Sequence, residues 1–463
     1  MSVKERRAAV KNPFKRYFFG YLVFATLLVF SSLSLAGQAK NIILMIGDGM
    51  GPAHVQVAWL YATRQLGKSL VMTEVMNNGQ TAYMFNDTAD STVTESAAAA
   101  VQMATGVKVL AKSIGIGPDG KTLKTILEMA KEKGKATGLV TTSGITDATP
   151  AGFVAHVQKR SEEEKIAEQL VKSDVTILFG GRKAFFLPEA EKGRRKDGRN
   201  LLNEARQNGY VVVETAEEMR RAEGGKILGL FNQGNMLFEL DRKGTTEPSL
   251  AEMTAKALDV LSKNENGFFL MVEAGRIDHA AHHHDIAAVI SDLLAFDEAI
   301  KVAYDFQKSR PYSLLIITAD HETGGLAVLP YAQTGEEYEG INLKAISQIK
   351  ASHEKRNKEF GKDPSPEKIQ EVMRAYYGIE LKDEEVKVIK EDALRKLDAR
   401  HFHYEWDGSI GFVLRLYHRI GWATDSHSAT PLFLWGIGPG SEKIKGWKHN
   451  TEVFSIMKEA YGF

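Results

Sequence analysis

The sequence predicts an α/β fold: a three-layer sandwich with a largely parallel central sheet, helices on both faces, and a mainly helical insertion. Three observations predict it. Short apolar runs rich in Val, Ile, Leu and Phe alternate with longer amphipathic segments, several of these segments begin with helix-capping residues, and one long charged stretch breaks the alternation. Apolar runs of this kind are typical of parallel strands that are buried on both faces.

The apolar runs are the expected strands. They lie at 41–46, 138–142, 175–179, 210–213, 268–272, 314–318 and 432–436. Helices are expected to begin where Ser or Thr is followed three residues later by Glu, which is the capping-box pattern. The pattern occurs at Ser161, Thr215 and Ser249.

The charged stretch at about 331–417 is interpreted as a mainly helical insertion. Ser365 followed by Pro366 predicts a cap and a first helical turn. The first clear apolar run in the stretch, 410–414, predicts a strand. We expect the insertion to lie over the carboxyl edge of the sheet, and the pattern leaves open whether it forms a lid, a dimer contact or neither.

The amino-terminal segment is predicted to lie outside the folded domain. Basic residues are followed by an apolar run at 17–30 and by small residues up to Ala39. This order is typical of a secretory signal peptide, here residues 1–36, and an uncleaved anchor to about residue 39 is the alternative. Residues 40–463 would then be a periplasmic or secreted domain that meets a membrane only if the anchor stays attached.

Composition excludes several kinds of chemistry. The 463 residues include 59 Lys+Arg, 59 Asp+Glu and no Cys. Because the formal net charge is zero, no bulk positive field is available to hold a nucleic acid. The lack of Cys removes disulfides, thiolate metal sites and a thiol nucleophile. A metal site in this chain must therefore use His and carboxylates.

Asp48 directly follows the first expected strand, in the motif Gly47-Asp48-Gly49-Met50-Gly51. Open α/β sheets place their ligands at strand ends of this kind. Glycine lets a ligand approach the backbone closely, but Gly and Asp are also the usual residues of an ordinary turn. Taken alone, the motif leaves both interpretations open.

Ser96 precedes an alanine-rich run that ends at Gly106. Alanine favours a helix and glycine ends one, so Ser96 is expected at or near a helix amino terminus. There it is either the helix cap or a hydroxyl on which the free amides and the dipole stabilise an anion or a phosphoryl group. Spacing does not separate the two.

Histidines cluster after the run at 268–272. If a helix starts near Ile277, Asp278 and His282 are four residues apart and share a face, which suits two ligands of one ion. His283 and His284 are expected to face away, at the surface.

Two further clusters lie beside expected strands. Asp320 and His321 follow the run at 314–318, and His427 precedes the run at 432–436. Each alone reads as a polar loop. Together with the first cluster they favour a shared metal site.

Six motifs, in order from about residue 41 to the carboxyl end, resemble the bacterial alkaline phosphatase family. They are Gly47-Asp48-Gly49-Met50-Gly51, Glu95-Ser96-Ala97, Asp147-Ala148-Thr149-Pro150, Ile277-Asp278-His279 with His282, Ala319-Asp320-His321-Glu322-Thr323-Gly324-Gly325 and His427-Ser428-Ala429-Thr430-Pro431. The resemblance implies an exported enzyme that hydrolyses small phosphate monoesters and releases phosphate. It also implies a homodimer.

The resemblance assigns roles to single residues. Ser96 resembles the nucleophile that becomes phosphoserine, Arg160 resembles the phosphate clamp, and His279 joins them in the substrate-binding set. The implied metal ligands are Asp278, His282 and His427 for one Zn²⁺, Asp48, Asp320 and His321 for a second Zn²⁺, and Thr149, Glu273 and Asp147, with Asp48 bridging, for a third ion. Hard oxygen ligands suit Mg²⁺ at the third position. Co²⁺ is the alternative there, because His279 replaces the Lys of some relatives.

A second departure from the family pattern, besides His279, lies before the expected nucleophile. Glu95 stands where many members have Asp, and its extra methylene changes how Arg160 is braced. Among rival classes, a sulfatase or phosphonate hydrolase usually uses a modified Cys or a Thr, which Ser96 disfavours. An exported metal-binding or phosphate-binding protein without turnover is the rival from a different class.

Overall fold

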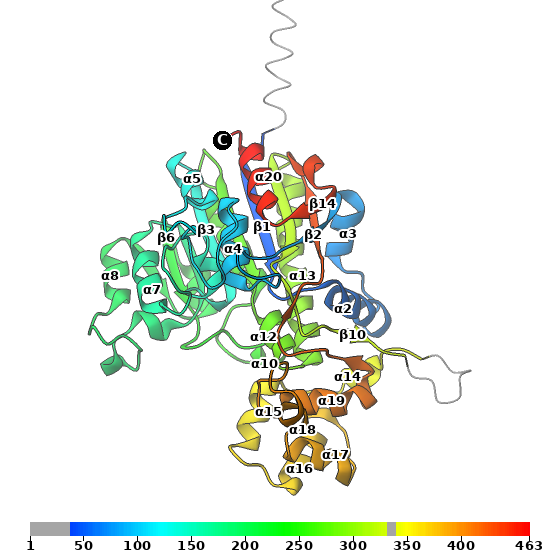
Figure 1. Cartoon of the computed structure of the whole chain (residues 1–463). Coiled ribbons are helices and arrows are strands. Elements are labelled where there is room, and N and C mark those ends of the chain that lie inside the picture. The colour runs from blue at the N-terminus through cyan, green and yellow to red at the C-terminus, as the bar shows by residue number, and fades with distance from the viewer. Residues whose placement is uncertain (1–37, 331–338) are drawn as a thin grey trace, which may run out of the picture.

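The fold of the described residues, 38–330 and 339–463, is organised around one large sheet (Figure 1). In this computed structural model the sheet contains ten strands among those residues, in the order β14-β2-β13-β8-β1-β7-β3-β4-β6-β5. Only β13 runs antiparallel to its neighbours within the described sheet. The strands are β1 (Asn41–Gly47), β2 (Gln80–Phe85), β3 (Ala136–Gly144), β4 (Ile177–Gly181), β5 (Tyr210–Val213), β6 (Lys226–Leu230), β7 (Phe268–Ala274), β8 (Ser313–Ala319), β13 (Leu432–Ile437) and β14 (Gly446–His449).

Helices cover both faces of this sheet. Figure 1 shows α4, α5 and α20 in front of the strands and α13 behind them. Every residue of β1, β7 and β8 is buried as a result, which explains their continuous apolar sequences. The helices of this part are α2 (Pro52–Gln65), α3 (Val71–Asn78), α4 (Ser96–Thr105), α5 (Ile126–Glu132), α6 (Ala148–Ala151), α7 (Glu163–Lys172), α8 (Leu201–Gln207), α9 (Ala216–Arg221), α10 (Glu239–Arg242), α11 (Leu250–Leu261), α12 (Arg276–His282), α13 (Ile286–Ser309) and α20 (Thr451–Tyr461). The predicted three-layer α/β sandwich is confirmed.

A second group of helices lies next to α12, below the sheet in Figure 1. It consists of α14 (Leu343–Ile346), α15 (His353–Phe360), α16 (Pro366–Tyr377), α17 (Asp383–Lys390), α18 (Ala393–Leu397) and α19 (Asp407–His418). Contacts that join it to the helix and loop that follow β7 include the pair of Arg276 with Glu354 and the approach of His283 Nδ1 to an Asp407 oxygen, at 2.5 Å. The predicted helical character is confirmed for the described residues, while 331–338 lie outside them. That this segment is an insertion stays a prediction.

The predicted strand at 410–414 is wrong. These residues belong to α19, where Ile410, Val413 and Leu414 are buried at the spacing of one helix face. The segment was correctly recognised as apolar, but the spacing of its buried residues is that of a helix and not that of a strand. The sequence analysis also missed β2, β6 and β14; β2 alternates between buried and exposed residues instead of forming an apolar run.

Helix starts were predicted with one error. Thr215, Ser249 and Ser365 each cap a helix by accepting a hydrogen bond from the backbone three residues later. Ser161 does not, because α7 begins at Glu163 and its N-cap residue is Glu162, which makes no side-chain cap.

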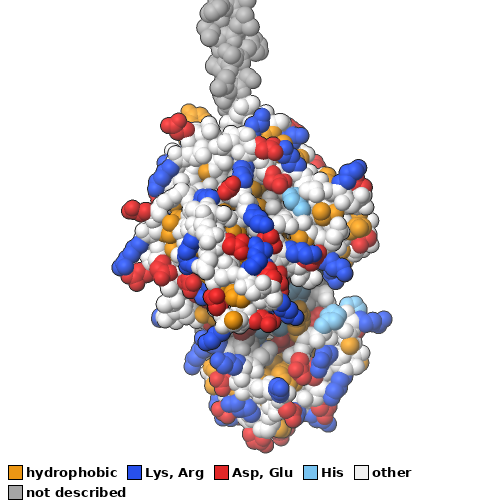
Figure 2. All heavy atoms as spheres, turned by 90° about the vertical axis from the view of Figure 1, so that its left-hand side faces the viewer, with side chains coloured by type: hydrophobic (Ala, Val, Ile, Leu, Met, Phe, Trp, Pro, Cys, Tyr) orange, Lys and Arg blue, Asp and Glu red, His pale blue; other side chains and the backbone are white. Residues whose placement is uncertain are grey.

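The surface carries charges of both signs. Figure 2 shows acidic and basic side chains interspersed over one face, in keeping with the equal totals in the sequence. Among the described residues no helix combines the length and the apolar character that crossing a membrane requires. The predicted signal segment, residues 1–36, lies outside the described residues.

Candidate functional site

The candidate residues meet at the carboxyl ends of the central strands. Asp48 follows β1, Asp278 lies on α12 just beyond β7, and Asp320 follows β8. The short strands β9 (Glu322–Thr323) and β12 (His427–Ser428) pair with each other, and this brings His427 beside Thr323. Because β8, β1 and β7 are adjacent in the sheet, residues from distant parts of the chain converge on one place.

Close approach at this point depends on Gly49. It has a left-handed φ of +70°, and an added Cβ would lie 2.8 Å from Asp278 Cα. Any other residue would push α12 away from the end of β1. The glycine therefore serves a backbone contact between two parts of the site.

The first cluster contains Asp278, His282 and His427. His282 Nε2 lies 3.2 Å from Asp278 Oδ2 and 3.2 Å from His427 Nε2. His282 Nδ1 lies 2.5 Å from the Asp425 carbonyl oxygen, and His427 Nδ1 lies 3.1 Å from that of Thr94. Since a carbonyl only accepts, each Nδ1 donates, and a neutral ring then leaves Nε2 as an acceptor facing the cluster.

The second cluster contains Asp48, Asp320 and His321. His321 Nε2 lies 3.5 Å from Asp48 Oδ1 and 3.3 Å from Asp320 Oδ2. Asp320 Oδ1 accepts from the amides of Gly49 and His321, at 3.1 and 2.9 Å. Asp320 Oδ2 and Asp48 Oδ1 are buried without a hydrogen-bond partner among the described residues. Buried oxygens of this kind are costly unless a cation or a proton satisfies them.

The two clusters adjoin through His321. Its ring stacks on that of His427, with the centroids 3.7 Å apart. Two groups of residues have potential ligand atoms that all lie within 4.8 Å of one another. The first group is Asp278, His321 and His427, and the second is Asp48, Asp320 and His321. The chain thus concentrates carboxylates and imidazoles as cation-binding centres do.

Ser96 lies at the edge of the second cluster. Its Oγ is 3.2 Å from His321 Nε2. α4 begins at Ser96, but the helix cap is Glu95, whose side chain accepts from the amides of Ala97 and Ala98 at 3.1 and 2.8 Å. The cap interpretation of Ser96 is therefore wrong, and its hydroxyl is available for another role.

Arg160 is braced by two carboxylates. Its Nη1 lies 2.8 Å from Glu95 Oε2, and its Nη2 lies 3.1 Å from Asp147 Oδ1. Burial would lower the pKa of Arg160, but Asp147 and Glu95 raise it, so the guanidinium stays charged. Glu95 thus links Arg160 to the start of α4 beside Ser96.

Glu273 and Thr149 form the third part of the site, with Asp147 nearby. Glu273 is the last residue but one of β7, accepts a hydrogen bond from Thr141, and has its pKa raised to about 7 by burial. The Thr149 hydroxyl is buried and has no hydrogen-bond partner among the described residues. Asp147 is already engaged, because Arg182 lies 2.8 Å from its Oδ2 in addition to the contact with Arg160.

His279 is placed on α12, one residue beyond Asp278. Its Nδ1 lies 2.8 Å from Arg276 Nη1, and burial together with Arg276 lowers its pKa to about 3. The side chain is therefore a neutral imidazole with one nitrogen committed to Arg276.

The expectation that His284 faces outward is wrong. α12 ends at His282, and His284 takes a left-handed φ of +53° that turns its ring inward. The residue is 5% exposed, and its Nε2 lies 2.9 Å from the Thr424 carbonyl oxygen. His283 is partly buried and stacks on His353, with centroids 4.0 Å apart. The expectation assumed that the helix continues through His284, whereas α12 ends at His282 and helical spacing does not apply beyond it.

Sequence reasoning missed three supporting residues. Arg182 braces Asp147, and the Asp425 carbonyl orients His282. Tyr404, from the segment before α19, lies with its ring centroid 5.8 Å from that of His282. None of the three carries a local signal in the sequence, and Asp425 acts through a backbone carbonyl that every residue has.

In the absence of metal, we expect the site to lower the stability of the folded protein as pH rises. Burial would lower the pKa of His282, but Asp278 raises it to about 9, and burial raises that of Glu273 to about 7. Both groups have a higher pKa in the folded protein than in the unfolded chain, where it is about 6.5 for His and about 4.3 for Glu. Their protonation therefore adds fully to the free energy of unfolding below the unfolded pKa values, and this contribution is lost as pH rises through the folded pKa values.

We therefore expect the melting temperature of chelator-treated protein to fall by several degrees between about pH 6.5 and pH 9. Zinc and magnesium should suppress the fall if they bind at these two groups, because a bound cation would hold each group deprotonated throughout. Thermal melts with and without added metal would measure it. Parallel curves for the two forms would contradict the expectation.

Comparison with known proteins identifies the family. The sequence profile of the alkaline phosphatase family matches residues 39–463. Alkaline phosphatase 4 of Bacillus subtilis is 33% identical over 436 residues, which is 91% of this chain and 89% of that protein. Alkaline phosphatase of Escherichia coli is 34% identical over 353 residues, 66% of this chain and 75% of that protein.

A solved structure agrees. The crystal structure of Thermus thermophilus alkaline phosphatase superposes with a TM-score of 0.85 at 33% identity, covering 92% of each chain. Fold and site together define a phosphoric monoester hydrolase of a metal-dependent class. The chain belongs to the alkaline phosphatase family.

Proposed function

We propose that this chain is an exported alkaline phosphatase that hydrolyses phosphate monoesters through a phosphoserine intermediate on Ser96. Two Zn²⁺ ions and a third ion, Mg²⁺ or Co²⁺, would support the reaction. The observation that carries the proposal is the position of Ser96 Oγ, 3.2 Å from His321 Nε2 where the two clusters adjoin. Export rests on the amino-terminal pattern of basic, apolar and small residues.

The residues present fit metal ions. Unpartnered buried oxygens on Asp48 and Asp320, and imidazole nitrogens turned toward the clusters, are the donor set that zinc takes when cysteine is lacking. Asp278, His282 and His427 would hold one Zn²⁺, Asp48, Asp320 and His321 the second, and Glu273, Thr149 and Asp147 the third ion. Bound there, the ions would supply Lewis-acid stabilisation to attacking and leaving oxygens of an in-line displacement.

The chain's own groups bind and orient the substrate. The Arg160 guanidinium presents further N–H donors to two phosphate oxygens, while Glu95 and Asp147 hold its plane in place. Ser96 Oγ faces the same space from the first turn of α4, whose amides and dipole favour the developing negative charge. Since recognition is directed at the phosphoryl group, the alcohol contributes little, and broad monoester specificity follows.

The test uses purified full-length protein with p-nitrophenyl phosphate and p-nitrophenyl sulfate, before and after chelation. We expect release of phosphate that stops on chelation and returns with zinc and magnesium, and much slower release of sulfate. Preferred hydrolysis of the sulfate ester would favour a sulfatase. If the protein bound phosphate or metal but hydrolysed neither ester when both metals were supplied, the result would contradict the proposal and favour a binding protein.

Replacing Arg160 should weaken phosphate binding. In Arg160→Lys the paired donors become a single ammonium, so we expect the inhibition constant of inorganic phosphate to rise by about tenfold or more. Glu95→Gln should have a smaller effect in the same direction, because an amide still bonds Arg160 but does not attract its charge. Inhibition assays at several phosphate concentrations measure both.

The matched control is Arg199→Lys. Arg199 also pairs with a carboxylate, Glu204 at 2.6 Å, but outside the site. Its phosphate inhibition should equal that of wild type. If Arg160→Lys did the same, Arg160 would not bind the phosphoryl group.

A further inference from the structure

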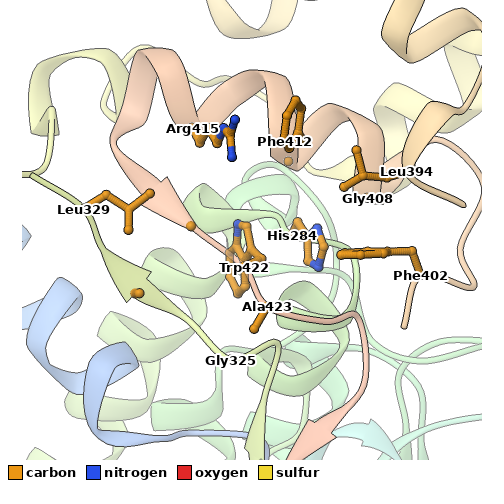
Figure 3. A pocket seen from close by; sticks show the side chains of 13 residues that line it. His284, Gly325, Leu329, Leu394, Phe402, Gly408, Phe412, Arg415, Trp422 and Ala423 are labelled. Carbon is orange, nitrogen blue, oxygen red and sulfur yellow. The ribbon is translucent and has the colours of Figure 1, made fainter. Parts of the chain in front are cut away.

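A cavity lies beside α19 and is lined in part by the segment that precedes His427. It has a volume of about 280 Å³, is partly open to solvent, and is lined by residues of α19, by the segment from Gly325 to Leu329, and by Trp422 and Ala423 (Figure 3). None of the proposed metal ligands lines it, and neither does Ser96 or Arg160. It is therefore a different place from the catalytic centre described above.

Aromatic rings form much of the wall. The rings of His284 and Trp422 stack with centroids 5.0 Å apart and an interplanar angle of 9°, and the Phe402 ring meets His284 edge-on at 5.9 Å. Phe412 faces them from α19 (Figure 3). Planar apolar walls of this kind favour a flat, aromatic ligand.

The cavity also carries an unneutralised positive charge. Arg415 extends over the cavity from α19, with its guanidinium 3.7 Å from the Phe412 ring centroid (Figure 3). The Arg415 side chain is exposed at the cavity; among the described residues it makes no ion pair, and no acidic residue of that part of the chain lines the cavity. An anionic group on the ligand would therefore meet a cation with no competing carboxylate.

Two features of His284 at this wall are energetically unfavourable. Its backbone has a left-handed φ of +53°, and its Nδ1 is buried without a hydrogen-bond partner among the described residues. The ring nevertheless keeps its place beneath Gly411, where an added Cβ would come within 2.7 Å of it. Local costs of this sort concentrate at ligand sites, where the surrounding structure maintains them.

We propose that this cavity binds a small single-ring aromatic carboxylate. The ring would lie against the Trp422 and His284 faces, and the carboxylate would pair with Arg415. The size agrees, since a cavity of about 150 Å³ is sufficient for benzene, and the 280 Å³ here leaves room for the carboxylate.

The catalytic centre must be distinguished from this cavity, because a carboxylate also binds metals. The two places share a backbone: the Ala423 amide donates to the Gly324 carbonyl at 2.9 Å, and Asp425, two residues on, orients His282. Excess inorganic phosphate separates them, because it would occupy the catalytic centre and leave the cavity free.

The test is calorimetric titration of benzoate into metal-loaded, full-length protein with excess phosphate present. For nine heavy atoms we expect a Kd of about 0.1 to 1 mM. Benzyl alcohol, which lacks the charge, and cyclohexanecarboxylate, which lacks the flat ring, should each bind about fivefold more weakly or worse.

Arg415→Met should weaken benzoate binding by about fivefold or more, because the charge is lost while the stem is kept. Arg310→Met is the matched control: Arg310, the residue that follows α13, also stacks on a phenylalanine, with its guanidinium 4.7 Å from the Phe306 ring centroid, but it does not line this cavity. If Arg415→Met folds poorly, Ala423→Phe, which fills the cavity, should abolish binding instead. Absence of benzoate binding, displacement by phosphate, or an unchanged Kd in the folded cavity variants would overturn the proposal.

Discussion

Replacing Ser96 with alanine is expected to lower kcat for p-nitrophenyl phosphate by at least about 10⁴-fold while the metal content stays near that of wild type. The substitution removes the hydroxyl that would receive the phosphoryl group. It removes no helix cap, because Glu95 caps α4, and an alanine suits a helix that is already alanine-rich and buried throughout. Activity and stability should therefore separate. Initial rates, elemental analysis and a thermal melt measure the three quantities.

Ser291→Ala is the control for Ser96→Ala. Ser291 is also a helical serine, although it is only partly buried, and its hydroxyl donates to the Ala288 carbonyl at 3.0 Å, away from the site. Its activity should be unchanged. Full activity in Ser96→Ala would show that Ser96 is not the nucleophile, whereas loss of activity together with loss of metal would point to a structural role.

Asp278→Asn is expected to lower bound zinc by about one ion per chain and activity by at least about 10³-fold. Asp278 lies between His282 and His427, 3.2 and 3.7 Å from their Nε2 atoms. An amide of the same shape fills the space but supplies no negative charge to a cation. Elemental analysis and the phosphatase assay measure the two effects, and raising the zinc concentration should restore part of the activity.

Asp398→Asn is the matched control, because Asp398 also pairs with a histidine, His401 at 2.7 Å, but at an exposed place outside the site. It should keep its metal and its activity. Wild-type zinc content in Asp278→Asn would contradict the proposed ligand set.

The centre of the sheet could be predicted from the sequence because β1, β7 and β8 are buried on both faces and so consist of continuous apolar runs. The edge could not. β2 exposes alternate residues, and β14 has the sequence Gly-Trp-Lys-His, which shows no apolar run. The segment 410–414 failed for a related reason, since a short apolar run does not by itself distinguish a strand from a helix face.

The site shows the same division. Asp48, Asp278, Asp320 and their histidine partners could be predicted because they are ligand types placed at strand ends. Their supports could not, because the carbonyl oxygens of Thr94 and Asp425 that orient His427 and His282 are present in every residue and leave no mark on the sequence. The brace between Asp147 and Arg182 likewise depends on how strands are paired.

The contact of His427 with the Thr94 carbonyl joins positions 333 residues apart. On the proposed ligand set, a growing polypeptide that has not yet reached residue 427 lacks one donor, however well its earlier strands have assembled. Loading with zinc would then be a late event of maturation, after translation has passed that point and the closing segment has docked. Catalysis would start only in finished molecules, which would keep the enzyme inert during its synthesis.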